Sequence, residues 1–264
     1  MSGARLDMDA QWLLLDRVDS PRAVQTLRQG FAGVQSFWLF DDTEFQSARE
    51  LGPQLISLQG CPALNSLCQR DPQTWRGLLL HSSRPGEELL AHLRRMLTVS
   101  LGLSHRALLG FYNRQTASYF FDACDARELS RWLGPVQHVT WFGGTWADRA
   151  VGSEGWQQLH NPGLAVARLG VEESLSPRQR ERLQTCLLEQ HAYRWSQSMG
   201  VAYPQLWSHA QQGLMLGFTD RSVLDEWLWL RLQHPRKVLP LLPEGLPQQD
   251  RLDDLRSQWQ NDHP

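Results

Sequence analysis

Residues 11–30 read QWLLLDRVDSPRAVQTLRQG and combine a strand signal with a helix signal that follows at once. The apolar run within residues 11–18 is short and continuous, as in a buried strand. Ser20 suits a helix N-cap, Pro21 is favoured at the first helical position, and Gly30 is a typical helix stop. We therefore predict that the fold begins with a buried strand connected directly to a helix.

The same alternation of strand and helix signals continues to about residue 162. A helix is expected over residues 85–97, where five apolar side chains recur on one face at a period of 3.6. Further strand candidates are FWLF (37–40), PQLISL (53–58), RGLLLHS (76–82), ALLGFY (107–112) and VQHVTWFGG (136–144). Strands that alternate with helices predict an α/β-type lobe over residues 1–162, with a mixed or largely parallel sheet flanked by helices.

Beyond residue 162 only helix signals remain, which predicts an all-helical lobe over residues 163–264 and an α+β fold class overall. Ser176 and Gln179 have capping-box spacing before a long amphipathic stretch that ends at Gly200. The stretch DRSVLDEWLWLRLQ (220–233) is apolar around most of its circumference. The proline-rich HPRKVLPLLPEGLP (234–247) predicts a stiff linker before a last helix.

Composition and charge exclude several classes of protein. The chain has 264 residues, of which 41% are hydrophobic, so a sizeable core can form. Its 26 basic and 28 acidic residues are evenly spread, and no basic stripe predicts a nucleic-acid partner. Lys237 is the only lysine and follows no glycine-rich loop, which argues against P-loop, Schiff-base and kinase chemistry. No signal peptide or long apolar run is apparent, so we expect a cytoplasmic protein that does not bind membranes.

Signals for an enzyme are weak. The four cysteines form no C-x-x-C pair and the nine histidines have no zinc-ligand spacing, so no metal and no cofactor are expected. Cys124 lies between Asp122 and Asp125, whose charges would raise the pKa of its thiol and make it a poor nucleophile. His191 falls within a helical apolar stripe and is expected to be a satisfied core or interface histidine. We expect no catalytic residues.

One stretch leaves an alternative open, because FDDTEFQSARELGPQLISL (40–58) places two aspartates directly after a strand signal. If the first two strands were parallel neighbours, Asp16, Asp41 and Asp42 would cluster at one edge, as in a metal-dependent hydrolase. The favoured interpretation is that Asp41 or Asp42 caps a helix over residues 43–50.

Tryptophans are the most prominent candidate contact residues. Trp141, Trp146 and Trp156 fall in a polar, glycine-bearing segment, residues 140–163, which is expected to join the two lobes. Trp227 and Trp229 lie on the strongly apolar helix predicted above. Because buried tryptophans dominate binding hot spots, these five residues are the candidates for a partner-binding cleft between the lobes. The alternative is that those of the joining segment simply fill the junction.

The order of several segments resembles a known family. LLLDRVDSP, ELGPQLISL, WRGLLLHSSRPGEELLAHLRRMLTV and ALLGFYNRQTASYFFDACDARELSRWLGPVQHVTW follow one another like the blocks of type VI secretion effector chaperones, the Tap- or TEC-type adaptors that share one domain of unknown function. The resemblance covers residues 11–160. Where that family often reads F-Y-D-P-R, this chain has Phe111, Tyr112, Asn113, Arg114 and Gln115.

The resemblance implies a cytoplasmic adaptor without enzymatic activity. Such a protein binds a type VI secretion effector as its client and helps to load it onto the VgrG spike, and the five tryptophans would then bind the client. Two alternatives from other classes stay open: the hydrolase that would use Asp16, Asp41 and Asp42, and an immunity-type protein that neutralises a toxin domain.

Overall fold

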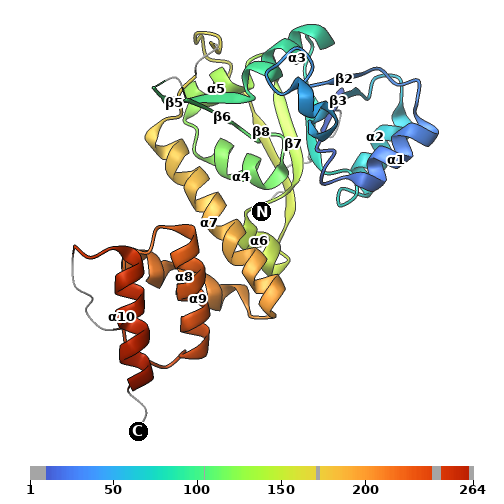
Figure 1. Cartoon of the computed structure of the whole chain (residues 1–264). Coiled ribbons are helices and arrows are strands. Elements are labelled where there is room, and N and C mark those ends of the chain that lie inside the picture. Colours follow the sequence, from blue (N-terminus) through green and yellow to red (C-terminus); the bar gives the residue numbers. More distant parts are fainter. Residues whose placement is uncertain (1–9, 104, 171–172, 240–244, 262–264) are drawn as a thin grey trace, which may run out of the picture. The chain divides into compact units, whose positions relative to one another are not determined.

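The computed structural model describes residues 10–103, 105–170, 173–239 and 245–261 (Figure 1). The chain divides into two compact units, Met1–Cys186 and Leu187–Pro264. The boundary lies inside helix α7 (Pro177–Met199), later than the residue 162 expected from the sequence. The early part of α7 belongs to the first unit because its apolar face, including Leu183, packs on the core of that unit.

The first unit contains a six-stranded sheet with the order β2-β3-β1-β4-β7-β8. Its strands are β1 (Trp12–Leu15), β2 (Ser36–Trp38), β3 (Gln54–Ser57), β4 (Gly77–His81), β7 (His138–Gly143) and β8 (Gly155–His160). A second sheet pairs β5 (Thr98–Gly102) with β6 (His105–Leu108). Every neighbouring pair in the six-stranded sheet is antiparallel, so the fold class is α+β as predicted, whereas the expected mixed or largely parallel sheet is wrong.

The sheet is antiparallel because the two strands that each helix connects are not neighbours, and another strand of the sheet lies between them. Helix α1 (Pro21–Gly30) connects β1 to β2, which run parallel, but β3 lies between them. Helix α2 (Pro62–Arg70) connects β3 to β4 in the same way, with β1 between them. The element order β1-α1-β2-β3-α2-β4 is that of the ferredoxin-like split βαβ arrangement, which produces an antiparallel sheet from helical crossovers.

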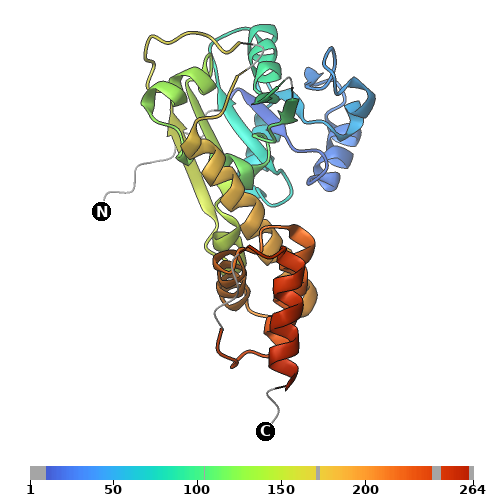
Figure 2. The same ribbon diagram turned by 60° about the vertical axis from the view of Figure 1, so that its left-hand side comes forward.

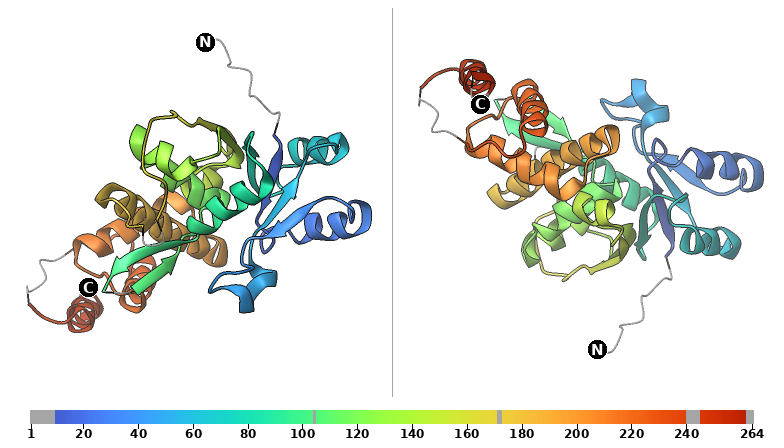
Figure 3. Two further views of the ribbon diagram at one scale, coloured as in Figure 1. Left: turned by 90° about the horizontal axis from the view of Figure 1, so that it is seen from above. Right: turned by 90° about the horizontal axis from the view of Figure 1, so that it is seen from below.

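Both faces of this sheet are covered, as the continuous apolar run at the start of the chain predicts. Side chains alternate along β1, so Trp12 and Leu14 join one core cluster whereas Leu13 and Leu15 join another. The first cluster packs under α3 (Gly86–Arg95), α4 (Arg114–Asp122) and α5 (Ala126–Leu133), and the second packs under α1 and α2. Figure 3 shows α1 and α2 on one side of the first strands and α3 on the other.

The second unit is helical, as predicted. It contains the end of α7 together with α8 (Tyr203–Met215), α9 (Arg221–Gln233) and α10 (Gln248–Asn261), which pack side by side in Figures 1 and 2. Its core surrounds Trp227, with Leu206, Phe218 and Trp259 among the contributors. Part of the predicted stiff linker, residues 240–244, lies outside the described residues. None of the helices described is both long enough and apolar enough to cross a membrane.

Candidate functional site

Trp141 and Trp146, two of the five candidate contact residues, lie in the interior of the first unit. Trp141 on β7 is 3% exposed, and its indole N–H donates a hydrogen bond to Ser118 Oγ at 3.0 Å. Trp146, the first residue of α6 (Trp146–Val151), is 8% exposed, and its backbone N–H donates to Tyr119 Oη at 2.9 Å. Because the fold covers both rings, the structure gives these two side chains a packing role.

The segment that was expected to join the lobes is instead part of the sheet. Strand β7, helix α6 and strand β8 occupy most of residues 140–163, and β8 forms an edge of the sheet. Trp156 pairs with Phe142 across the two strands, so it lies on the face opposite to Trp141. Its ring meets Phe142 edge-on, with ring centroids 5.6 Å apart. The sequence of this segment is polar like that of a loop because β8 is an edge strand, which can leave polar side chains open to solvent.

The other two candidates, Trp227 and Trp229, lie on different faces of helix α9. Trp227 is fully buried, and its indole N–H donates to the carbonyl oxygen of His209 at 2.7 Å. Trp229 follows two residues later, which is roughly 200° around the helix, and its side chain is 50% exposed. Of the five tryptophans predicted to bind a partner, Trp229 is the one whose ring is half open to solvent. The predicted cleft between the two lobes stays a prediction.

Trp229 borders a pocket of about 420 Å³ within the second unit. The pocket is lined by Trp195, Asp225, Glu226, Trp229, Leu230, Gln233, Arg256 and Gln260. Asp225 Oδ1 accepts a hydrogen bond from the Trp195 indole at 2.8 Å and lies 2.6 Å from His191 Nε2. His191 therefore lies beside a carboxylate of its own unit, in line with the core or interface position expected for it. A half-exposed indole beside fixed carboxylates can hold an apolar side chain that has a hydrogen-bond donor or a cation next to it.

The three aspartates of the hydrolase alternative have separate partners. Asp41 Oδ1 lies 2.8 Å from Arg49 Nε, and Asp42 Oδ2 lies 3.1 Å from Arg94 Nη1. Asp16 directly follows β1, and β3 separates β1 from the strand that precedes the other two aspartates. The premise of neighbouring parallel strands is therefore wrong, because the two strands are parallel but not adjacent.

The expected helix cap at these aspartates is also wrong. The helix there is a short 3-10 helix, η1 (Gln46–Leu51), which begins after Phe45 and has no side-chain cap. Asp41 and Asp42 are used instead in the ion pairs with arginines, and Asp42 adopts a φ of 56°. Across the described parts of the chain, no group of three or more His, Cys, Asp or Glu side chains is placed to hold a metal ion.

Asp16 lies in a buried polar cluster with Asn113. The side-chain amide of Asn113 donates to Asp16 Oδ2 and to Asp19 Oδ2, both at 3.1 Å, and its oxygen accepts from two backbone N–H groups at the start of α4. Burial, and then the charge of Asp19, raise the pKa of the Asp16 carboxyl. Burial, assisted by Asp16, also raises the pKa of the Tyr112 hydroxyl to about 12.

The thiol of Cys124 is unsuited to nucleophilic chemistry, as predicted, although the main cause is different. Burial, with smaller contributions from the nearby charges of Glu128 and Asp125, raises its pKa to about 12. From the sequence, the flanking charges were the expected cause of the raised pKa, because the spacing of acidic residues does not reveal burial.

Comparison with known proteins identifies one part of the chain. Residues 11–131 match the family model described as Domain of unknown function (DUF4123). The chain contains a DUF4123 domain. No curated protein and no solved structure matches the chain. The DUF4123 domain covers β1 to most of α5, so β7, β8 and the helices from α6 onward lie outside it.

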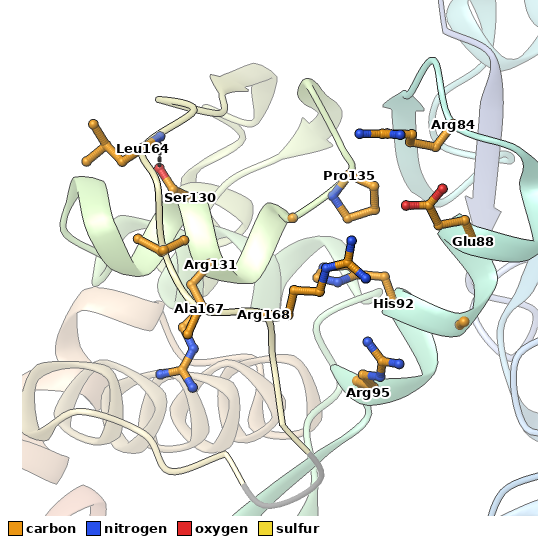
Figure 4. Close-up of a pocket in the computed structure, with 13 residues that line it drawn as sticks. Arg84, Glu88, His92, Arg95, Ser130, Arg131, Pro135, Leu164, Ala167 and Arg168 are labelled. Carbon is orange, nitrogen blue, oxygen red and sulfur yellow. Dashed lines mark hydrogen bonds between the residues drawn. The ribbon is translucent and has the colours of Figure 1, made fainter.

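A second pocket lies in the first unit and is lined by arginines that the linear pattern did not single out (Figure 4). Arg84 precedes α3, Arg95 is the last residue of α3, Arg131 lies on α5, and Arg168 lies in the extended segment after β8. The first three belong to the DUF4123 domain and Arg168 follows it. Because these residues come from three separate segments, only the fold brings them together. The high arginine content was the only signal for them in the sequence.

Proposed function

We propose that the protein is a non-enzymatic cytoplasmic adaptor, a chaperone that binds a type VI secretion effector and helps to load it onto the VgrG spike. One observation carries the proposal. The ordered segments that resemble the effector chaperones lie within residues 11–160, and the DUF4123 domain covers residues 11–131 of the same stretch. The direct contact with VgrG is part of this proposal.

The pocket beside Trp229 supports a role in binding. A tryptophan that is 50% exposed on a helix of a folded unit presents a large apolar surface to solvent. The same pocket offers Asp225 and Glu226, and the carboxylate of Glu226 is fixed by Arg256 Nη2 at 2.9 Å. An apolar anchor with fixed polar groups around it is the usual composition of a binding hot spot. We therefore propose Trp229 as a client contact in place of the full set of five tryptophans.

Co-expression of the chain with candidate type VI effectors and VgrG proteins tests the proposal. A stable complex should survive purification with the wild-type chain. It should weaken with Trp229→Ala and persist with Met215→Ala, a matched change at a residue of the same unit that is 78% exposed. If no effector or VgrG co-purifies with the wild-type chain, the proposed function is wrong. Binding to the toxic domain with loss of toxicity would instead assign an immunity role.

A further inference from the structure

The arginine-lined pocket in the first unit has a volume of about 290 Å³. Arg84, Arg95 and Arg168 come from different segments, and Figure 4 shows their side chains around His92 and Pro135. Arg131 belongs to the same lining, but its guanidinium group points elsewhere and pairs with Glu173. The pocket therefore contains three converging cationic groups.

These three guanidinium groups lack the compensation that other arginines of the fold have. Arg94, on the same helix as Arg95, pairs with Asp42 and also donates to two backbone carbonyl groups. The backbone N–H of Arg84 donates to Ser82 Oγ, but among the described residues no ion pair or hydrogen bond involves the guanidinium group of Arg84, Arg95 or Arg168. Glu88 is the only acidic side chain among the described residues of the lining. Like charges gathered around one opening repel one another and attract an anion.

The walls of the pocket are fixed before any ligand arrives. His92 is 7% exposed, and its Nε2 lies 2.8 Å from the carbonyl oxygen of Trp132. The side-chain amide of Asn161 donates to the carbonyl oxygens of Gly134 at 3.0 Å and Val136 at 2.9 Å, which ties the segment that leads to Arg168 onto the loop that follows α5. A site whose walls are already ordered loses less entropy when it binds.

We propose that this pocket binds an acidic peptide segment of the protein partner, with Asp or Glu carboxylates held by Arg84, Arg95 and Arg168. This inference rests on the proposed function, in which the ligand is a protein. Guanidinium groups bind carboxylates through paired N–H···O bonds, which suits several arginines around one opening. Leu164, which is 45% exposed, borders the same pocket and can contact apolar residues beside the acidic ones.

The lining favours a peptide over a nucleotide. Apart from the buried ring of His92, the described lining residues provide no aromatic face on which a base could stack. Among its described residues, the lining also has no glycine-rich run of backbone N–H groups of the kind that surrounds a phosphate chain. Its three free cationic groups lie before α3, at the end of α3 and after β8, an arrangement suited to carboxylates that are themselves spread along a peptide.

Fluorescence anisotropy with labelled hexaglutamate tests the proposal on the full chain, with hexaglutamine as the neutral probe. The wild-type chain should bind hexaglutamate, more weakly as salt rises, and should not bind hexaglutamine. The triple variant Arg84→Gln/Arg95→Gln/Arg168→Gln should lose affinity by about tenfold or more. The control is Arg22→Gln/Arg70→Gln/Arg127→Gln, which removes the same charge from exposed arginines elsewhere in the unit and should change affinity by less than about twofold.

If both triple variants lose affinity for hexaglutamate equally, the attraction is one of general charge and the proposal is overturned. It is also overturned if the pocket variant still binds hexaglutamate with wild-type affinity. Complete displacement of the probe by equimolar inorganic phosphate would assign a phosphate site instead and also overturn it. A pull-down of the co-expressed effector separates the two proposals. Capture by the wild-type chain that is unchanged in the pocket variant refutes the pocket inference and leaves the adaptor function intact. Binding of hexaglutamate in the pocket without capture of any effector or VgrG refutes the adaptor function alone.

Discussion

Two tryptophans on α9, Trp227 and Trp229, should respond to truncation in opposite ways. Trp227 is fully buried, and its indole hydrogen bond satisfies a buried backbone carbonyl group at His209. Trp227→Ala removes that bond and opens a cavity at the centre of the helical core. Core tryptophan truncations cost about 3–5 kcal/mol of unfolding free energy. Trp229 is half exposed, so Trp229→Ala forfeits about half the burial energy of a large apolar side chain, or about 1 kcal/mol.

The size of the second unit makes this difference easy to measure. At about 0.05–0.15 kcal/mol per residue, a unit that spans Leu187–Pro264 has an unfolding free energy of about 4–12 kcal/mol. The unfolding free energy lost in Trp227→Ala is therefore a large fraction of the unfolding free energy of this unit. Urea denaturation followed by far-UV circular dichroism should show a midpoint lower by about 2 M for Trp227→Ala, and a shift of about 0.5 M for Trp229→Ala.

Trp229→Ala, the variant with the smaller loss of stability, should have a direct effect on client affinity. Loss of a hot-spot tryptophan costs about 2 kcal/mol of binding free energy, or roughly thirtyfold in Kd. Trp229→Ala should show this loss while its unit stays folded. If Trp229→Ala unfolds as early as Trp227→Ala, the half-exposed ring is a structural residue. If it binds the client with wild-type affinity, the proposed contact is wrong. A wild-type midpoint for Trp227→Ala would refute the description of the core.

Three further changes test other parts of the structure. Gly134→Ala should lower the unfolding free energy by about 2–4 kcal/mol in a denaturation curve, because Gly134 has a φ of 52° and a Cβ there would lie 2.3 Å from the buried ring of His92. Asp125→Ala should cost about 1 kcal/mol in the same assay, because it removes the reciprocal capping box with Glu128 at the start of α5. Burial raises the folded-state pKa of Asp16 above 3.8, so its contribution to stability is present below that pH and is lost as pH rises through the raised pKa. The stability of Asp16→Asn relative to wild type should therefore increase as pH rises above 3.8, and a difference that shrinks would contradict this sign.

Helices could be predicted from the sequence because their signals are local. Ser176 and Gln179 form the predicted reciprocal bonds, with Gln179 Oε1 accepting from the Ser176 backbone N–H at 2.9 Å and Ser176 Oγ accepting from the Gln179 backbone N–H at 3.4 Å. Helix α1 begins at Pro21 as expected. Ser20 does not cap it, however, because its hydroxyl bonds with the backbone of Arg76. The backbone just before β4, far away in the sequence, therefore takes a side chain that local signals assign to the helix cap.

Strand direction and the composition of the candidate sites could not be predicted in the same way. Whether β1 neighbours β2 depends on which segment pairs between them, and that choice is made by residues at Gln54–Ser57 that follow a long connection. The exposure of Trp229 and the burial of Trp227 likewise depend on which face of α9 meets the other helices. A helix that is apolar around most of its circumference has no broad polar stripe to indicate that face. The arginine pocket could not be predicted either, because its arginines lie far apart in the sequence and only the fold brings them together.

Asn113 shows how a departure from a family pattern can be explained once the fold is known. The adaptors that this chain resembles often have F-Y-D-P-R where it has an asparagine followed by Arg114. The asparagine oxygen caps α4, while its amide donates to Asp16 and Asp19. An aspartate could make the cap but would add a third carboxylate to the other two. Arg114, in place of the proline, is 2% exposed and donates to the carbonyl oxygen of Phe142 on β7 at 3.2 Å. The two differences therefore act together: one relieves charge repulsion near the end of β1, and the other ties the start of α4 to a strand beyond the DUF4123 domain.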